Sequence, residues 1–184
     1  ATCFYVESGG QVSDSGWISA LDGSWEISIG EVRKPAAGII VHRGKVTRGQ
    51  PQVDDLSAAA VDGARRRDIM RNHTATHLLH AALHSVLGEH ARQAGSLVAP
   101  DHLRFDFTHP EGMTALQLEQ VEAQVNRAIL DNHHLNITTK TLTQAMDEGA
   151  TALFGEKYGE IVRTIAIGGK QPFSYELCGG THVD

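Results

Sequence analysis

The first third of the chain consists of short apolar or alternating runs separated by glycine and aspartate. The segment Trp25-Glu26-Ile27-Ser28-Ile29 alternates at period two, which is typical of a half-buried strand. We expect strands at 4–6, 17–21, 25–32, 39–41 and 53–61. Several short strands at this spacing favour a small barrel or sandwich, so residues 1–62 are predicted to form a β-barrel-like, β-rich subdomain.

The pattern becomes helical after Asp62-Gly63. Apolar positions recur at Ile69, Leu79 and Leu83, and Gly88 is a suitable stop, so a helix is predicted over 64–87. Four histidines within it, at 73, 77, 80 and 84, are spaced by four, three and four residues and form a stripe along one face.

The remaining elements mix both types. Residues 103–107 alternate as a strand, and Thr114-Ala115-Leu116-Gln117 has the form of a capping box that opens a helix reaching about residue 129. A strand over 137–142, a short helix over 143–148, and strands over 161–167 and 173–177 follow. The fold class is therefore predicted as α+β, with a core over 63–184 whose helices cover a mostly antiparallel sheet.

Two pairs of side chains at opposite ends of this core suggest a metal site. His73 and His77 are four apart on a helix, so both imidazoles point in one direction. Cys178 and His182 form a second pair near the chain's last residue. A thiolate and imidazoles are ligands that Zn²⁺ prefers, at about 2.0–2.3 Å. We predict that these four residues bind one zinc ion.

The chemistry of such a site stays open at this point. A closed four-ligand zinc is usually structural, whereas a catalytic zinc keeps a position for water. The glutamate that zinc proteases carry between the paired histidines is absent here, since Thr74, Ala75 and Thr76 occupy those positions. The neighbouring small and hydroxyl residues leave room for a ligand. His80 either orients a ligand or is an ordinary hydrogen-bonded residue, and His84 is expected to be the latter.

Charge and composition narrow the class of protein. With a net charge of −6 the chain is not expected to coat nucleic acid non-specifically. A local cluster at the start of the helix, formed by Arg65, Arg66, Arg67 and Arg71, can still steer a phosphate-bearing ligand. The pair Gly9-Gly10 is either a tight turn or a place where backbone approaches a ligand.

Cysteine content and hydropathy indicate the cellular compartment in which the protein is expected. Two cysteines give no disulfide framework, and a zinc thiolate needs a reducing compartment, so a cytoplasmic location is expected. No apolar run reaches the roughly 18–20 residues of a membrane span, and no signal peptide opens the chain. Because the chain begins Ala-Thr-Cys-Phe without Met, it is expected to be cut from something longer.

Three motifs together resemble one family. Residues 71–80 (RNHTATHLLH) resemble the first zinc motif of the alanyl-tRNA synthetase editing domain, and residues 176–182 (ELCGGTH) its second. Residues 4–12 (FYVESGGQV) resemble the preceding glycine-rich motif. Segments 93–98, 103–107 and 152–158 match intervening family segments in the same order. Threonyl-tRNA synthetase editing domains are more distantly similar, and free-standing alanyl editing proteins share the core.

The resemblance implies hydrolysis of wrongly charged Ser-tRNA(Ala) and Gly-tRNA(Ala), within an ATP-using alanine–tRNA ligase. An alanine pocket discriminates small groups by only about 1–3 kcal/mol, so a second site must destroy the errors. It also implies that Thr76 and Gln93 line the substrate pocket, with Gly9, Gly10 and His80 as further substrate-binding candidates. Polar groups in that pocket would pair with a serine hydroxyl and not with an alanine methyl group, which accounts for serine and leaves glycine hydrolysis unexplained. Within this resemblance the arginines at 65–67 and 71 are nominated for contact with tRNA.

Under this resemblance, zinc is expected to hold the aminoacyl end and to polarise or position water. Neither motif shows an obvious carboxylate base, so water or the substrate's neighbouring hydroxyl is expected to carry the proton traffic. The sequence departs from the family at Cys3, where proline is expected, and it ends two residues after His182. Two alternatives are a free-standing trans-editing protein and a non-catalytic, zinc-stabilised tRNA-binding module.

Overall fold

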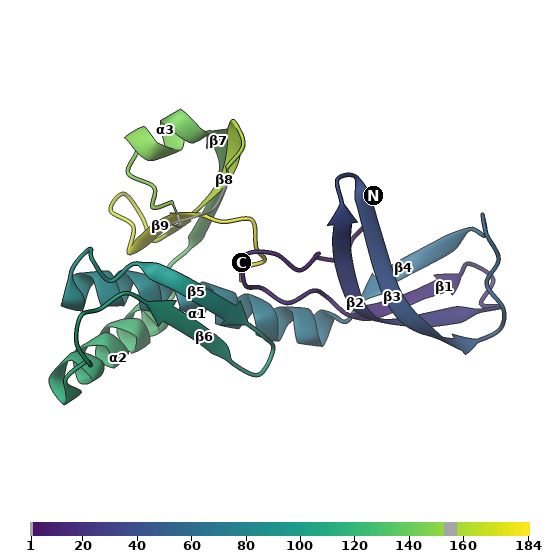
Figure 1. Cartoon of the computed structure of the whole chain (residues 1–184), viewed down its shortest axis with the longest axis horizontal. Helices are drawn as coiled ribbons and strands as arrows, with labels where there is room; N and C mark the ends of the chain where they lie inside the picture. The colour runs from purple at the N-terminus through teal and green to yellow at the C-terminus, as the bar shows by residue number, and fades with distance from the viewer. Residues whose placement is uncertain (1, 153–157) are drawn as a thin grey trace.

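The computed structural model describes residues 2–152 and 158–184. An N-terminal sheet lies at one end of the molecule and an α+β core at the other, and the long helix α1 leads from the sheet into the core (Figure 1). The predicted α+β class is confirmed. No helix among the described residues has both the length and the apolar character that spanning a membrane requires.

The N-terminal sheet has four antiparallel strands in the order β3-β2-β1-β4. They are β1 (Gly16–Ala20), β2 (Glu26–Ala36), β3 (Ile39–Arg48) and β4 (Ser57–Val61). Within the described residues β3 and β4 are opposite edges of this sheet, so the expected barrel-like closure is not formed. Residues 4–6 were also expected as a strand and do not form one. Phe4 is instead a buried anchor that packs with Ile29 and Val32.

The core contains two further sheets, both antiparallel, where one sheet was expected. A two-stranded sheet pairs β5 (Gln93–Val98) with β6 (Leu103–Phe107), and a three-stranded sheet has the order β7-β8-β9. Its strands are β7 (Leu135–Thr141), β8 (Ile161–Ile167) and β9 (Ser174–Leu177), accompanied by α2 (Ala115–Leu130) and α3 (Leu142–Asp147). β5 was not predicted as a strand. The family-like segment 152–158 falls largely on residues 153–157, outside the described residues.

Helix α1 (Gly63–Leu87) is the element around which the core is packed. The Asp62 side chain caps its first turn by accepting from the Arg65 amide at 3.0 Å, and Gly88, with φ of 104°, follows its last residue. Leu83 and Ala82 pack against α2 through Val121. α1 buries polar residues as well as apolar ones, which explains why its apolar pattern is interrupted by histidines and threonines.

The segment before β1 ties the two ends of the molecule together. Val98 of β5 bonds through its amide to the Gly10 carbonyl at 2.8 Å and through its carbonyl to the Val12 amide at 3.1 Å. Gly9 and Gly10 form a turn closed by Ser8 and Gln11, and a Cβ on Gly10 would lie 2.3 Å from the Ser96 hydroxyl oxygen. The close approach at Gly10 is therefore to the protein's own β5. The division of the chain near residue 62 stays a prediction.

Candidate metal centre

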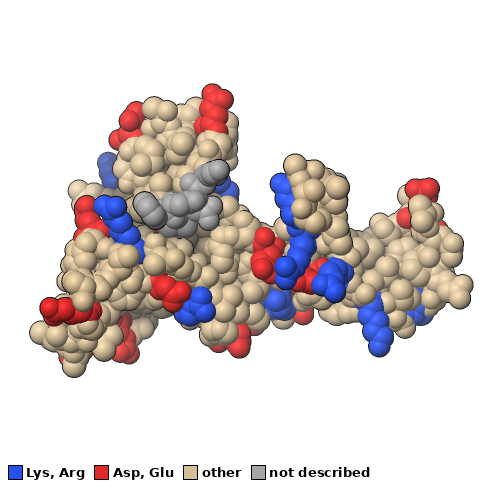
Figure 2. Space-filling view, viewed as in Figure 1, with Lys and Arg blue, Asp and Glu red and all other residues tan. Residues whose placement is uncertain are grey.

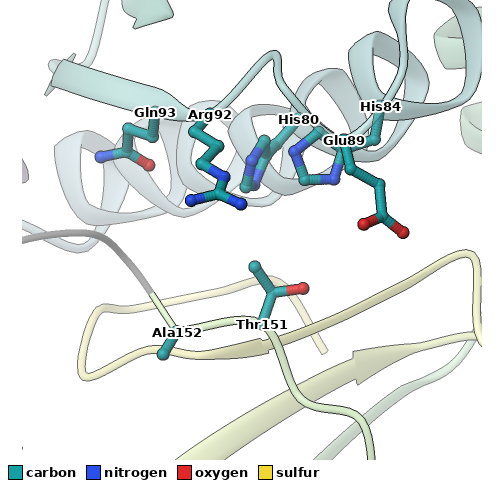
Figure 3. A pocket seen from close by; sticks show the side chains of 7 residues that line it. All are labelled: His80, His84, Glu89, Arg92, Gln93, Thr151 and Ala152. Carbon is teal, nitrogen blue, oxygen red and sulfur yellow. The ribbon is translucent and has the colours of Figure 1, made fainter. Parts of the chain in front are cut away.

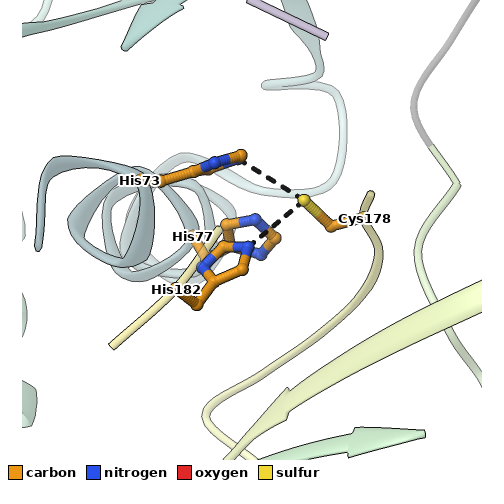
Figure 4. Close-up of side chains that lie close together, drawn as sticks. All are labelled: His73, His77, Cys178 and His182. Carbon is orange, nitrogen blue, oxygen red and sulfur yellow. Dashed lines mark hydrogen bonds between the residues drawn. The ribbon is translucent and has the colours of Figure 1, made fainter. Parts of the chain in front are cut away.

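The structure brings the four predicted ligands to one point. His73 and His77 project from α1, and Cys178 and His182 come from the segment that follows β9 (Figure 4). Their ligand atoms all lie within 4.8 Å of one another. The Cys178 Sγ is 3.4 Å from His73 Nε2 and 3.3 Å from His182 Nε2. Neighbouring ligand atoms of a tetrahedral zinc stand about 3.5 Å apart, so this donor set fits zinc.

Each imidazole is oriented through its other nitrogen, Nδ1. His73 Nδ1 bonds to Gln11 Oε1 at 2.7 Å, and His182 Nδ1 bonds to the Thr74 hydroxyl oxygen at 3.2 Å. His77 Nδ1 lies 3.1 Å from a carboxylate oxygen of Glu176, close enough for an ion pair although not aligned as a hydrogen bond. All three rings thus direct Nε2 at the centre. Such outer contacts fix the tautomer and orientation of metal-binding histidines.

Glu176 and Gln11 contact the candidate ligands His77 and His73, and the sequence analysis did not single out either residue. The buried Glu176 carboxylate also accepts hydrogen bonds from His80 Nδ1 at 3.0 Å and from the Ser174 hydroxyl at 3.1 Å. Burial raises the pKa of this carboxyl, but the electrostatic interaction with the His77 ring and these hydrogen bonds outweigh burial, and the net pKa is lowered. The available signal was a glutamate in a short strand, two residues before Cys178 and at the first position of the second zinc motif.

Burial sets the protonation of the metal-binding groups. It lowers the pKa of His73 to about 3, and it lowers the pKa of His77 and of His182 as well. It raises the pKa of the Cys178 thiol to about 11. The imidazoles are therefore neutral and ready to bind a metal near pH 7, whereas the thiol must give up a proton to do so.

The loop that carries Cys178 and His182 is held in place by contacts with its backbone. The Arg163 guanidinium donates to the carbonyls of Cys178 at 3.0 Å and Gly180 at 2.6 Å. Gly180 lies so close to His73 that an added Cβ would be 2.0 Å from the His73 Cε1 atom. Only glycine fits at this position of the loop.

A cavity of about 210 Å³ opens beside the four ligands, and we call it the zinc pocket. His73, His77 and Cys178 line it together with three of the sequence-predicted substrate residues, Gly9, Thr76 and Gln93. The Thr76 hydroxyl donates to the Asn72 carbonyl at 2.8 Å, so its oxygen still has lone pairs to accept a hydrogen bond. Of the other two candidates, Gly10 packs against β5, and His80 lines a neighbouring cavity.

The arginines nominated for tRNA contact are divided by the fold. Arg65 donates to the Ser13 carbonyl at 2.8 Å, and Arg66 forms an ion pair with Asp14, so both anchor the N-terminal segment to α1. Arg71 pairs with Asp68 at 2.7 Å, and Arg67 is exposed. On the face seen in Figure 2, basic and acidic side chains alternate instead of forming one continuous basic surface. Their contact with tRNA stays a prediction.

Comparison with known proteins agrees with the motifs. Residues 1–65 match the family model of the tRNA synthetases class II (A). The chain is 53% identical over 182 residues to the alanine–tRNA ligase of Pelotomaculum thermopropionicum. The matched region covers 99% of this chain and 20% of that protein. The chain is a relative of one segment of the alanine–tRNA ligases. The ligase of Herpetosiphon aurantiacus is 49% identical over 191 residues, covering 97% of the chain and 21% of that protein.

The ligase of Myxococcus xanthus gives the same picture, with 50% identity over 182 residues, 99% of the chain and 20% of the ligase. The chain thus spans about a fifth of the length of the alanine–tRNA ligases it matches. The predicted resemblance to alanyl-tRNA synthetase is confirmed.

Proposed function

We propose that this chain is an aminoacyl-tRNA deacylase, which hydrolyses the ester of Ser-tRNA(Ala) and Gly-tRNA(Ala) within an alanine–tRNA ligase of the cytoplasm. The observation that carries the proposal is one cavity in which three zinc-ligand residues meet Thr76 and Gln93. A metal-centred pocket next to hydroxyl and amide groups suits a small polar amino acid held by an ester. A cluster serving structure alone would not require such a cavity.

The pocket residues act on the substrate by hydrogen bonding. The free lone pairs of Thr76 Oγ1 accept from a serine hydroxyl, and the Gln93 side chain, held by its bond to the Ser96 hydroxyl at 3.2 Å, borders the same space. An alanine methyl group offers the remaining Thr76 lone pairs no donor, and each hydrogen bond lost relative to serine costs about 0.5–1.5 kcal/mol. Correctly charged alanine tRNA is thereby disfavoured.

The described residues would hold zinc through His73, His77, Cys178 and His182. When bound there, zinc supplies Lewis-acid polarisation of the ester or water. Glu176 lies close by, but its oxygens already contact His77, His80 and Ser174. It therefore orients imidazoles and does not accept the proton of the attacking water. We assign that proton to the leaving ribose oxygen, which receives it from solvent or through the neighbouring ribose hydroxyl of the substrate.

The test uses the zinc-loaded chain and Ser-tRNA(Ala). His73→Ala and Cys178→Ala should lose zinc and abolish deacylation, whereas His133→Ala, a histidine outside the zinc pocket, should retain both. Hydrolysis at the normal rate by a zinc-free variant would contradict the catalytic role. Binding of tRNA without hydrolysis would instead favour the zinc-stabilised binding module. Sequencing the natural gene product upstream of Ala1 separates a synthetase from a free-standing editing protein.

A further inference from the structure

A second cavity of about 310 Å³ adjoins the zinc pocket, and Gln93 lines both (Figure 3). His80 and His84 of α1 face it from one side, and Thr151 lies across from them. Glu89 and Arg92 complete its polar lining. The volume is within the range of roughly 300–1,000 Å³ that is typical of small-molecule sites.

Two buried nitrogen atoms of this lining have no hydrogen-bond partner within the described residues. They are His80 Nε2 and His84 Nε2, and the His80 side chain is only 3% exposed. His80 Nδ1 is fixed by Glu176, so its ring cannot simply turn to find another partner. Buried polar groups normally have partners, so this pair at a cavity wall is available to water or to a polar ligand that enters the cavity.

Arg92 adds a cation to the same wall. Its guanidinium is exposed and makes no hydrogen bond or ion pair with the part of the chain that the structure describes. Glu89 adds a carboxylate to the same lining, near His84 in Figure 3, which disfavours a site for a bare anion. Two imidazoles, a guanidinium, an amide and a hydroxyl together suit a polar heteroaromatic group, because unstacked bases stack on histidine and arginine and hydrogen-bond along their edges.

The position of the second cavity indicates which nucleotide of the substrate would lie there. In the substrate an ester joins the amino acid to the last ribose, so the terminal nucleotide must lie directly beside the aminoacyl group. The second cavity meets this requirement because Gln93 lines both this cavity and the zinc pocket. The apolar groove on the other side of α1, lined by Leu78 and Ile129, shares no residue with the zinc pocket.

We propose that the second cavity binds the terminal nucleotide of the tRNA acceptor strand while the amino acid occupies the zinc pocket. This inference rests on the proposed deacylase function. Arg92 and His84 contact the base or ribose from the cavity wall, and His80, held by Glu176, presents its free Nε2 to the same ligand.

The test measures binding of adenosine 5′-monophosphate (AMP) to the zinc-loaded chain and, separately, deacylation kinetics with Ser-tRNA(Ala). Arg92→Gln and His84→Leu should each weaken AMP binding and raise KM by about tenfold, equivalent to about 1.4 kcal/mol, with kcat and zinc content unchanged. Arg104→Gln is the matched control, because Arg104 is an exposed arginine of β6 that pairs with Asp106 and lies outside the cavity.

The two readouts separate this inference from the proposed function. AMP binding that depends on Arg92 and His84 supports the second cavity even when the chain shows no deacylation. Normal deacylation with an unchanged KM in both variants overturns the nucleotide site and leaves the deacylase proposal intact. The inference is also overturned when wild type does not bind AMP, when inorganic phosphate displaces AMP equally well, or when Arg104→Gln weakens binding to the same extent.

Discussion

Gln11 and His73 are joined by a 2.7 Å hydrogen bond between positions 62 residues apart in the chain. The same Gln11 oxygen accepts from the Thr181 amide at 2.9 Å, and the Gln11 amide nitrogen donates to the Thr181 hydroxyl at 2.9 Å. One fully buried side chain therefore connects the N-terminal segment, helix α1 and the loop of the second zinc motif. The metal centre depends on three distant parts of the sequence at once.

Replacing Gln11 by alanine should weaken zinc binding by about 10–100-fold, because His73 loses the partner that fixes its ring and tautomer. Competition with a fluorescent chelator measures the affinity. Gln52→Ala is the control, since the exposed Gln52 lies in the loop before β4 and does not line the zinc pocket. Equal zinc affinity in the Gln11 and Gln52 variants would show that the hydrogen bond to His73 has no role in metal binding.

The two glycines of the second motif should differ in how well they tolerate substitution by alanine. Gly180→Ala places a Cβ 2.0 Å from His73 Cε1 and should displace the ring and cost most of the zinc affinity, whereas a Cβ on Gly179 has no atom within 4 Å. Zinc content after dialysis measures the difference, and thermal unfolding shows whether each variant is still folded. A Gly180→Ala protein with normal zinc content would disprove the tight fit of this loop.

Zinc binding near pH 7 should release about one proton. The pKa of the Cys178 thiol is about 11, so the thiol is protonated without metal, while the imidazole of His73, with a pKa of about 3, is already neutral. Apparent affinity should therefore rise about tenfold per pH unit between pH 7 and 9. Calorimetry in two buffers of different ionisation enthalpy counts the protons. Release of none, or of two or more, contradicts these protonation states.

Thr76→Val should lower hydrolysis of Ser-tRNA(Ala) while zinc content is preserved, because valine keeps the shape of threonine and removes the acceptor oxygen. Gln93→His should likewise change serine selectivity and leave the zinc content unaltered. Rates on Ser-tRNA(Ala) and Gly-tRNA(Ala) are compared, since glycine offers no hydroxyl to Thr76. If both rates fall equally in Thr76→Val, the hydroxyl contact is not the source of selectivity.

The sequence predicted local features better than long-range ones. The start and end of α1 follow from capping at Asp62 and Gly88, and the pairing of His73 with His77 follows from helical spacing. The contacts of Gln11 and Glu176 depend on how separate segments pack, which no local pattern encodes. The expected strand at residues 4–6 failed for a related reason, since Phe4 is apolar because it anchors the sheet's core and not because it extends a strand.

The nominated arginines illustrate the same limit. As a run, residues 65–67 suggested a basic surface, yet Arg66 is paired with Asp14 and Arg65 with the Ser13 carbonyl. Charge density along a sequence does not reveal which charges are matched by carboxylates from elsewhere in the chain. The exposed Arg67 and Arg92 remain available for phosphate or base contacts.

The most direct measurement compares initial rates of deacylation of Ser-tRNA(Ala) and Ala-tRNA(Ala) by the zinc-loaded wild-type chain. A pocket that pairs its polar groups with a serine hydroxyl and leaves them unpaired with a methyl should favour serine by at least about a hundredfold. We predict rapid release of serine and retention of alanine. Equal rates on the two substrates, or no hydrolysis of either, would contradict the proposed editing function.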